Sequence, residues 1–292
     1  MIKVLITGAD GQLGYELQRT VPDFIALTCT DSRELDITSS QAIDDSFRKI
    51  QPAVVINAAA YTAVDKAETD VDLARAVNAT GPKLLASACK AANIPMVQVS
   101  TDFVFDGNRS TPYSENVAPN PLSVYGHTKL EGEQFVRDLL PDSSLIIRTA
   151  WVYSAHGNNF VKTMLRLMQE KDQLGIVSDQ IGSPTWAHNL ANCVWNGVTT
   201  LLEGKVTHPV YHYTDAGTAS WYDFAVAIQK EALNLGLLNT SIPINPILTS
   251  DYPTPAVRPA YSVLDKAAAW RDLQAPQVNW RVALRAMLAE LV

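Results

Sequence analysis

Short apolar runs rich in β-branched residues alternate with longer amphipathic stretches along the first half of the chain. The apolar runs are KVLIT, FIALT, AVVIN, MVQVS and SLIIRT. Helix-like stretches lie around residues 12–20, 40–50, 70–93, 121–139 and 158–171. Runs of this length predict strands, and their alternation with helices predicts βαβ units that build a parallel sheet.

The pattern changes after about residue 150. A proline-rich segment, PINPILTSDYPTPAVRP (243–259), cannot be regular helix. Before it, LANCVWNGVTTLL (190–202) is helix-like and PVYHYT (209–214) strand-like, which predicts a return to the main sheet. We therefore expect an α/β fold with a doubly wound parallel-sheet (Rossmann) domain and a smaller α/β domain. The first comprises residues 1–150 plus about 190–215, and the second comprises about 151–189 and 216–292.

Composition narrows the choice of partners and location. The chain has 292 residues, 47% of them hydrophobic, with a net charge of -7, which argues against nucleic acid or an anionic membrane as the main partner. Cys29, Cys89 and Cys193 lie far apart, which favours reduced thiols and no zinc site. The N-terminus lacks a signal-peptide pattern and no apolar stretch reaches the length of a membrane span, so we expect a cytoplasmic protein.

Three glycines mark the first strand-to-helix junction. Gly8, Gly11 and Gly14 in VLITGADGQLGYELQ permit a tight turn and let backbone N–H groups approach a pyrophosphate at the start of a helix. The spacing is GxxGxxG, which an ordinary tight turn can also have. Its position after the first strand favours a dinucleotide site.

Two later segments fit a dinucleotide as well. After the second strand, Asp31 or Asp36 could accept hydrogen bonds from ribose or adenine, whereas Arg33 could meet a 2′-phosphate, so NADPH and NADH both remain open as cofactors. The small residues of INAAAYT (56–62) let the backbone lie close to a flat ring, although they also suit plain close packing.

A tyrosine and a lysine share one helix face in SVYGHTKLEGE. Tyr125 and Lys129 are four residues apart, and a nearby ammonium would lower the pKa of the phenol so that it could exchange a proton with a substrate oxygen. Ser100, Thr101 and Asp102 follow an earlier strand and offer a hydroxyl to orient a carbonyl, or else a turn or helix cap.

With these motifs together, the chain resembles the extended short-chain dehydrogenase/reductase family. The resemblance runs over nearly the whole chain, through TGADGQLGYELQ, VVINAAAYTAVDKAE, STDFVFDG, PLSVYGHTKLEGE, RTAWVYSAHGNNFVKTMLRL, DQIGSPT and YPTPAVRP. It is closer to the branch that reduces the C4 ketone of dTDP-4-dehydro-β-L-rhamnose with NADPH or NADH. It implies a nicotinamide-binding domain and a smaller domain that binds a nucleotide-sugar.

The resemblance also implies individual roles. Tyr125 is expected to be the proton donor, Lys129 its partner and Thr101 the hydroxyl that orients the carbonyl. The expected cofactor-binding residues, which also include Tyr125 and Lys129, are Gly8, Gly11, Gln12, Leu13, Gly14, Asp31, Arg33, Asp36, Ile37, Ala58, Ala59, Ala60, Tyr61, Thr62 and Val99.

Substrate contacts are expected from both halves of the chain. The resemblance implies Thr101, Asp102, Tyr125 and Trp151, although Trp151 could equally pack between domains. Asn159 could face the substrate or cap the following helix. Arg258 could bind a phosphate or pair with a surface carboxylate.

Metal binding is the point where the chain departs from its branch. Some members dimerise around magnesium held by carboxylates, and Glu16 and Glu290 match two of those positions. The third is His188, a poor ligand for a hard cation, so magnesium is doubtful and a monomer or weak homodimer is expected.

Two other functions compete with the reductase. One is another nucleotide-sugar reductase or 4-epimerase of the same fold. The other is a non-catalytic, dinucleotide-binding regulatory subunit similar to the methionine adenosyltransferase β subunit. The presence of Thr101, Tyr125 and Lys129 together favours catalysis.

Overall fold

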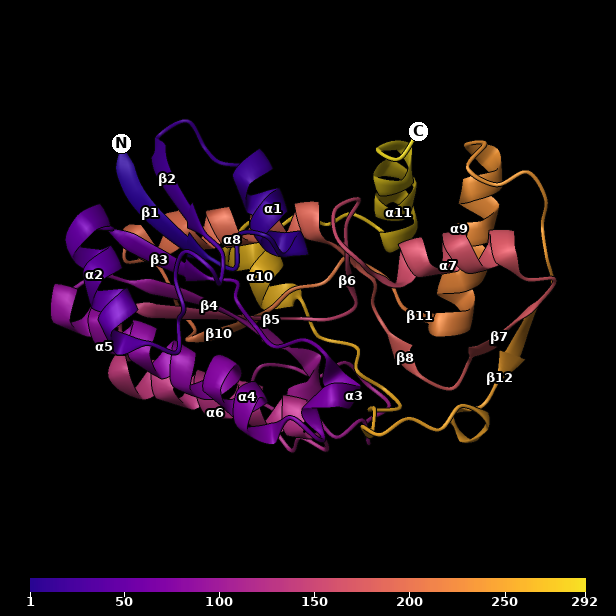
Figure 1. Ribbon diagram of the computed structural model, residues 1–292, viewed down its shortest axis with the longest axis horizontal. Coiled ribbons are helices and arrows are strands. Elements are labelled where there is room, and N and C mark those ends of the chain that lie inside the picture. The colour runs from indigo at the N-terminus through magenta and orange to yellow at the C-terminus, as the bar shows by residue number, and fades with distance from the viewer.

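The apolar runs of the first half form one parallel sheet in the computed structural model, which describes residues 1–292 (Figure 1). The strand order is β10-β5-β4-β3-β1-β2, and every neighbouring pair is parallel. The strands are β1 (Ile2–Thr7), β2 (Ile25–Thr30), β3 (Val54–Asn57), β4 (Met96–Thr101), β5 (Ser144–Thr149) and β10 (Val210–His212). The predicted parallel sheet, including the late return of the chain to it, is confirmed.

Helices cover both faces of this sheet because successive strand residues point to opposite sides. Val4 and Ile6 belong to one apolar core and Leu5 to the other. The first core is covered by α1 (Gln12–Arg19), α8 (Ala187–Leu202) and α10 (Ala267–Asp272). The second is covered by α2 (Ser40–Ile50), α5 (Gly81–Ala92) and α6 (Val124–Leu139). The chain thus builds a doubly wound α/β layer. Helix α10 packs in this layer, although it lies within 216–292, a range expected for the smaller domain.

The predicted helix at 70–93 has three parts: α4 (Val71–Arg75), the π-helical turn η1 (Ala76–Thr80) and α5. The π turn carries the buried Asn78, whose amide accepts a hydrogen bond from the Tyr61 N–H at 2.9 Å and donates to the Tyr61 carbonyl at 3.1 Å. Gly132 of α6 makes room for this turn, since a Cβ there would lie 2.2 Å from the Asn78 carbonyl oxygen. The loop around Tyr61 is therefore held at both of its peptide groups.

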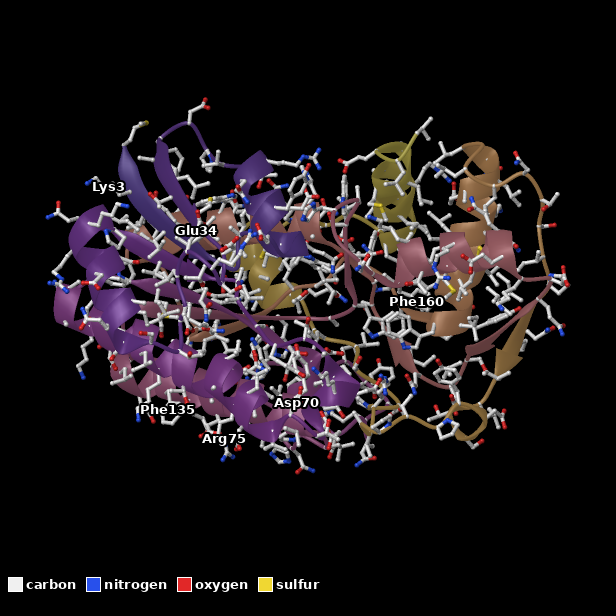
Figure 2. The ribbon with its side chains drawn as sticks, viewed as in Figure 1. Lys3, Glu34, Asp70, Arg75, Phe135 and Phe160 are labelled. Carbon is white, nitrogen blue, oxygen red and sulfur yellow. The ribbon has the colours of Figure 1, made fainter.

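A third apolar core lies beside the sheet layer and includes Met164, Phe224, Trp280 and Leu284. It is built by α7 (Phe160–Glu170), α9 (Trp221–Asn234) and α11 (Trp280–Ala289), with β7 (Leu174–Val177) paired to β12 (Ile244–Ile247). Figure 2 labels Phe160 at the end of α7 that is nearer the sheet layer. Short strands connect the two parts: β6 (Val152–Tyr153), β8 (Ile181–Gly182), β9 (Thr185–Trp186) and β11 (Ala219–Ser220).

The proline-rich segment contains no α-helix, as predicted. It forms β12, the short 3-10 turn η3 (Thr249–Asp251) and irregular chain up to Arg258. The small helices α3 (Val64–Ala67) and η2 (Asp102–Val104) follow β3 and β4. None of the helices combines the length and apolarity that a membrane span requires.

Candidate functional site

The glycines of the first junction lie where the sheet order reverses, between β1 and β3. Gly8 has φ +76°, and a Cβ there would lie 2.6 Å from the backbone nitrogen of Ala59. A Cβ on Gly14 would lie 2.2 Å from the Gly8 carbonyl oxygen. Both positions require glycine because backbone passes too close for a side chain. No side chain caps α1 at Gly11, so the amides of its first turn remain available to an anion.

A cavity of about 530 Å³ opens above this crevice, and we call it the main cavity. This volume lies in the range of small-molecule and cofactor sites. All of the expected cofactor residues line it except Gly14, which packs beneath the loop, and Arg33. The lining residues that the sequence reasoning did not assign to the cofactor are Asp10, Ser32, Leu35, Thr38, Leu73, Val77, Ser100, Thr149, Val152 and Leu190. They come from many separate elements, so no local motif identifies them.

Two buried hydroxyl groups in the wall of the main cavity have no hydrogen-bond partner. They are Ser100 Oγ at the end of β4 and Thr149 Oγ1 at the end of β5. Buried polar groups are normally paired, so unpaired hydroxyls facing a cavity indicate a ligand with polar groups of its own. A ligand that is apolar at this end of the cavity would leave both hydroxyls unsatisfied.

Tyr125 and Lys129 both lie on the buried face of α6. Ser123 caps the start of this helix by accepting from the Gly126 N–H at 3.2 Å. Lys129 Nζ donates to the Val99 carbonyl at 2.7 Å, which aims the ammonium at the cavity wall. The i, i+4 spacing and this bond hold the two groups on one side of the main cavity.

Burial controls the pKa of both groups. It raises the pKa of Tyr125 to about 12, against a smaller lowering by the hydrogen bond to Thr101. It lowers the pKa of Lys129 to about 8, and the charge of Glu133 opposes this change. The expected lowering of the Tyr125 pKa by Lys129 is therefore wrong for this structure, because desolvation dominates. Tyr125 is protonated at neutral pH and able to donate.

Thr101 connects Tyr125 to a buried carboxyl group. Its Oγ1 donates to Asp102 Oδ1 at 3.1 Å and accepts from the Phe103 N–H at 3.2 Å, so it caps η2 as well. Burial raises the pKa of Asp102 to about 6, with smaller opposing contributions from hydrogen bonds of Ser262 and Thr101. The hydroxyl of Thr101 thus lies between a phenol and a carboxyl that takes up a proton close to neutral pH.

The unusual pKa of Asp102 predicts a pH-dependent stability. The pKa of this carboxyl is raised from 3.8 to about 6 on folding, so the folded chain binds its proton more tightly than the unfolded chain does. The carboxyl therefore contributes fully to the free energy of unfolding at low pH, and this contribution is lost as the pH rises through about 6. The shift of about two units corresponds to about 3 kcal/mol. Asp102→Asn should remove this dependence. The free energy of unfolding of the variant should therefore rise relative to that of wild type as the pH increases from about 4 to about 7.

Urea unfolding at several pH values measures this difference. Asp45→Asn, at an exposed ion pair with Arg48 on α2, is the control and should parallel wild type. If Asp102→Asn also parallels wild type, folding does not raise the pKa of Asp102 and the prediction is wrong.

Next to Asp102 lies a small pocket built around two stacked tryptophans, which we call the tryptophan pocket. The rings of Trp151 and Trp221 are stacked with centroids 3.6 Å apart. Trp151 has φ +50°, a left-handed conformation that is rare for a large residue. Gly182 leaves room for the Trp151 ring, because a Cβ at position 182 would lie 2.5 Å from a ring carbon. The lining residues are Asp102, Phe103, Trp151, Gln180, Trp221, Arg258, Pro259 and Ser262.

A wider groove continues from the tryptophan pocket. The two share Gln180, Trp221 and Arg258, and the groove adds Asp65, Tyr252 and Thr254 with an apolar wall from α7 and β7. The structure therefore brings the expected substrate residues Asp102, Trp151 and Arg258 into one pocket. Trp221, Gln180 and Tyr252 were missed. Gln180 and Tyr252 lie in motifs noted from the sequence, DQIGSPT and YPTPAVRP, whereas Trp221 lies in none of them.

Asn159 lies elsewhere, and its position agrees with a helix cap. Its Oδ1 accepts from the Lys162 N–H at 3.1 Å at the start of α7. Its Nδ2 donates to Gln12 Oε1 at 2.9 Å and to the Ser154 carbonyl at 2.7 Å. Asn159 thus contacts the glycine-rich loop through Gln12 and lines neither the tryptophan pocket nor the groove.

The two carboxylates considered for magnesium are bridged by an arginine. Arg19 lies 3.2 Å from Glu16 and 3.0 Å from Glu290, and His188 Nδ1 is 3.5 Å from Glu16. No group of three or more His, Cys, Asp or Glu residues is arranged to hold a metal ion. Arg19 supplies the positive charge that these carboxylates require.

Comparison with known proteins agrees with this geometry. The model of the family described as RmlD substrate binding domain matches residues 2–292. The chain belongs to this family. A family relative, dTDP-4-dehydrorhamnose reductase of Aggregatibacter actinomycetemcomitans, is 42% identical over 288 residues, covering 98% of each chain. The resemblance inferred from the motifs is confirmed.

Solved structures of the family share the whole fold. A dTDP-4-dehydrorhamnose reductase of Clostridium acetobutylicum is 42% identical with a TM-score of 0.90, covering 99% of each chain. The enzyme of the same name from Bacillus anthracis, solved in complex with NADP, is 36% identical with a TM-score of 0.91 and covers 99% of this chain and 100% of that one. The predicted fold class is confirmed.

Proposed function

We propose that this chain reduces the C4 ketone of dTDP-4-dehydro-β-L-rhamnose to give dTDP-L-rhamnose, with a reduced nicotinamide dinucleotide in the main cavity. One observation carries the proposal: Tyr125 lines the main cavity, its pKa responds to Thr101, and Thr101 donates to Asp102, which lines the tryptophan pocket. A reductase needs its proton donor at such a junction, where cofactor and substrate meet. Relatives named dTDP-4-dehydrorhamnose reductase over nearly their full length support the choice of substrate.

The main cavity fits a nicotinamide dinucleotide. The uncapped start of α1 and the close-packed glycines suit a pyrophosphate. The unpaired hydroxyls of Ser100 and Thr149 suit a carboxamide, which both donates and accepts hydrogen bonds. When bound, the dinucleotide supplies the hydride that reduces the ketone carbon.

The side chains supply orientation and the proton. Thr101 Oγ1 orients the ketone oxygen by turning its single proton from Asp102 to the substrate, and Tyr125 transfers its hydroxyl proton to that oxygen as negative charge develops there. The pKa of Tyr125, about 12, keeps the proton in place at neutral pH, while an alkoxide is basic enough to take it. Lys129 lines the main cavity and is largely charged at neutral pH, since its pKa is about 8, so it can bind the ribose of the dinucleotide.

We also propose that NADPH is preferred to NADH. Asp31 Oδ1 already accepts from the backbone N–H groups of Arg33 and Glu34 at 2.7 and 3.0 Å, and its Oδ2 accepts from Arg33 Nε at 2.9 Å. It has little capacity left for a ribose hydroxyl. The Arg33 side chain is 81% exposed, and its Nη1, which has no protein acceptor, can meet a 2′-phosphate while Nε and Nη2 keep their bonds to Asp31.

The test is a turnover assay with dTDP-4-dehydro-β-L-rhamnose and each cofactor, with product identified by mass spectrometry and sugar analysis. We expect stoichiometric oxidation of the cofactor, dTDP-L-rhamnose as product, and kcat/KM at least about tenfold higher with NADPH, as a charged phosphate contact provides. Arg33→Ala should reduce that ratio. No oxidation by folded, cofactor-binding protein would contradict the function, and a preference for NADH would contradict the role of Arg33.

For the assembly we propose a monomer or weak homodimer, without a bridging metal. The support is that Arg19 of the same chain already neutralises Glu16 and Glu290. Light scattering should therefore give the same mass with and without magnesium chloride.

A further inference from the structure

An ion pair links the two parts of the molecule at the edge of the substrate groove. Asp65 lies on α3, and Arg258 lies on the irregular chain after η3; Figure 1 shows these segments side by side. Arg258 Nη1 donates to Asp65 Oδ1 at 2.9 Å and Nη2 donates to Oδ2 at 2.7 Å. The Ala256 N–H also donates to Asp65 Oδ1, at 3.2 Å. The carboxylate thus holds both the guanidinium and the backbone next to it.

Some N–H groups of Arg258 have further protein acceptors and others have none. Nη1 donates also to Thr254 Oγ1 at 2.6 Å and to the Ala256 carbonyl at 3.2 Å. Nε and the second N–H of Nη2 have no protein acceptor, although an arginine carries five N–H donors. These two parallel N–H groups form one edge of the guanidinium. Since Arg258 lines both the tryptophan pocket and the groove, this free edge is the part available to a ligand.

Two parallel N–H groups on one guanidinium edge match two oxygens of a phosphate. We infer that Asp65 is a positioning residue, which holds Arg258 so that its free Nε–Nη2 edge binds a phosphate of the nucleoside diphosphate part of the substrate. The inference rests on the proposed function for its ligand. Without Asp65 the guanidinium would lose its end-on partner and a backbone anchor, and would sample other rotamers.

Asp65 also comes shortly after the loop that lines the main cavity. Ala60, Tyr61 and Thr62 line that cavity, and the Asn78 side-chain amide bonds the Tyr61 N–H and carbonyl. Only two residues separate Thr62 from Asp65. The same short segment therefore borders the main cavity at one end and orients Arg258 at the other.

The experiment is titration calorimetry with dTDP as the probe, on protein saturated with NADP, together with kcat and KM. Arg258→Gln should weaken dTDP binding by about 10- to 100-fold, as expected for lost charged hydrogen bonds. Asp65→Asn should weaken it by about 5- to 10-fold and raise KM more than it lowers kcat, since the phosphate contact is made equally in the ground state and the transition state. The double variant should bind dTDP no more weakly than Arg258→Gln, because Asp65 acts through Arg258.

Two controls separate positioning from a general structural effect. Thymidine, which has no phosphate, should bind Asp65→Asn as it binds wild type. Asp45→Asn should leave dTDP binding unchanged, since it removes an exposed ion pair on α2.

The outcomes separate the positioning role of Asp65 from the phosphate contact of Arg258 and from the proposed reductase function. Unchanged dTDP binding in Arg258→Gln would refute the phosphate contact itself, and the inference with it. If Arg258→Gln weakens binding but Asp65→Asn does not, or if the losses add in the double variant, the positioning role alone is wrong. Turnover of the wild-type protein tests the reductase function independently of either result.

Discussion

Replacing Tyr125 with phenylalanine should lower kcat by about 10²- to 10⁴-fold, the usual contribution of a general acid, and leave nicotinamide dinucleotide affinity nearly unchanged. The substitution removes the hydroxyl that interacts with Thr101 and keeps the ring, which packs edge-on against Phe103 with centroids 5.5 Å apart. The cavity wall therefore survives while the proton donor is lost. Stopped-flow turnover and a dinucleotide titration measure the two effects separately.

Tyr222→Phe is the matched control. Tyr222 lies on α9 and lines neither the main cavity nor the tryptophan pocket, so its turnover should equal wild type. Wild-type turnover in Tyr125→Phe would refute the assignment of the proton donor. Equal losses of turnover and of dinucleotide affinity would instead show that the tyrosine serves mainly to bind the cofactor.

Arg148→Met should lower the free energy of unfolding by about 3–5 kcal/mol, because it leaves a buried carboxylate without a partner. Arg148 donates to both oxygens of Glu133 at 2.9 and 2.6 Å, and the two side chains are 3% and 1% exposed. In the wild-type protein the neighbouring His212 contributes no positive charge to this pair. Burial, aided by Arg148, lowers its pKa to about 3, so it is neutral.

Replacing the partner as well should restore most of this loss. A double variant, Arg148→Met with Glu133→Leu, leaves no unpaired charge and keeps the volume filled, and such replacements are often neutral. Arg166→Met is the control. It removes an exposed pair with Glu170, 59% and 48% exposed, and should change stability by less than about 0.5 kcal/mol. A loss under about 1 kcal/mol for Arg148→Met alone would show that Glu133 takes up a proton or gains water when unpaired.

Much of the fold could be read from local patterns. Each apolar run predicted in the first half is a strand of the sheet, and each amphipathic stretch contains a helix. The helix at 70–93 was predicted as one element, but it contains a π turn. That turn exists because Asn78 bonds the distant Tyr61 and Gly132 allows close approach, and neither contact is visible in local periodicity.

The candidate site was predictable to the extent that its residues are neighbours in sequence. The glycine spacing and the Tyr125–Lys129 pair follow from the geometry of a turn and of one helical turn. The sign of the Tyr125 pKa shift was not predictable, since it depends on burial by other elements. The tryptophan stack was missed for the same reason, since its members lie far apart along the chain. Pairing of Arg258 with a carboxylate was one of two alternatives, but Asp65 was not identified as the partner.

The sequence by itself determined the α/β class, the strand and helix order, the dinucleotide turn and the family, because these depend on local periodicity, backbone sterics and linear motifs. The tertiary structure decided which hydroxyls lack partners, which edge of the Arg258 guanidinium has no protein acceptor, and that Arg19 bridges Glu16 and Glu290. These properties arise from burial and from contacts between distant segments. Desolvation and pairing energies act only once the folded chain has brought those segments together.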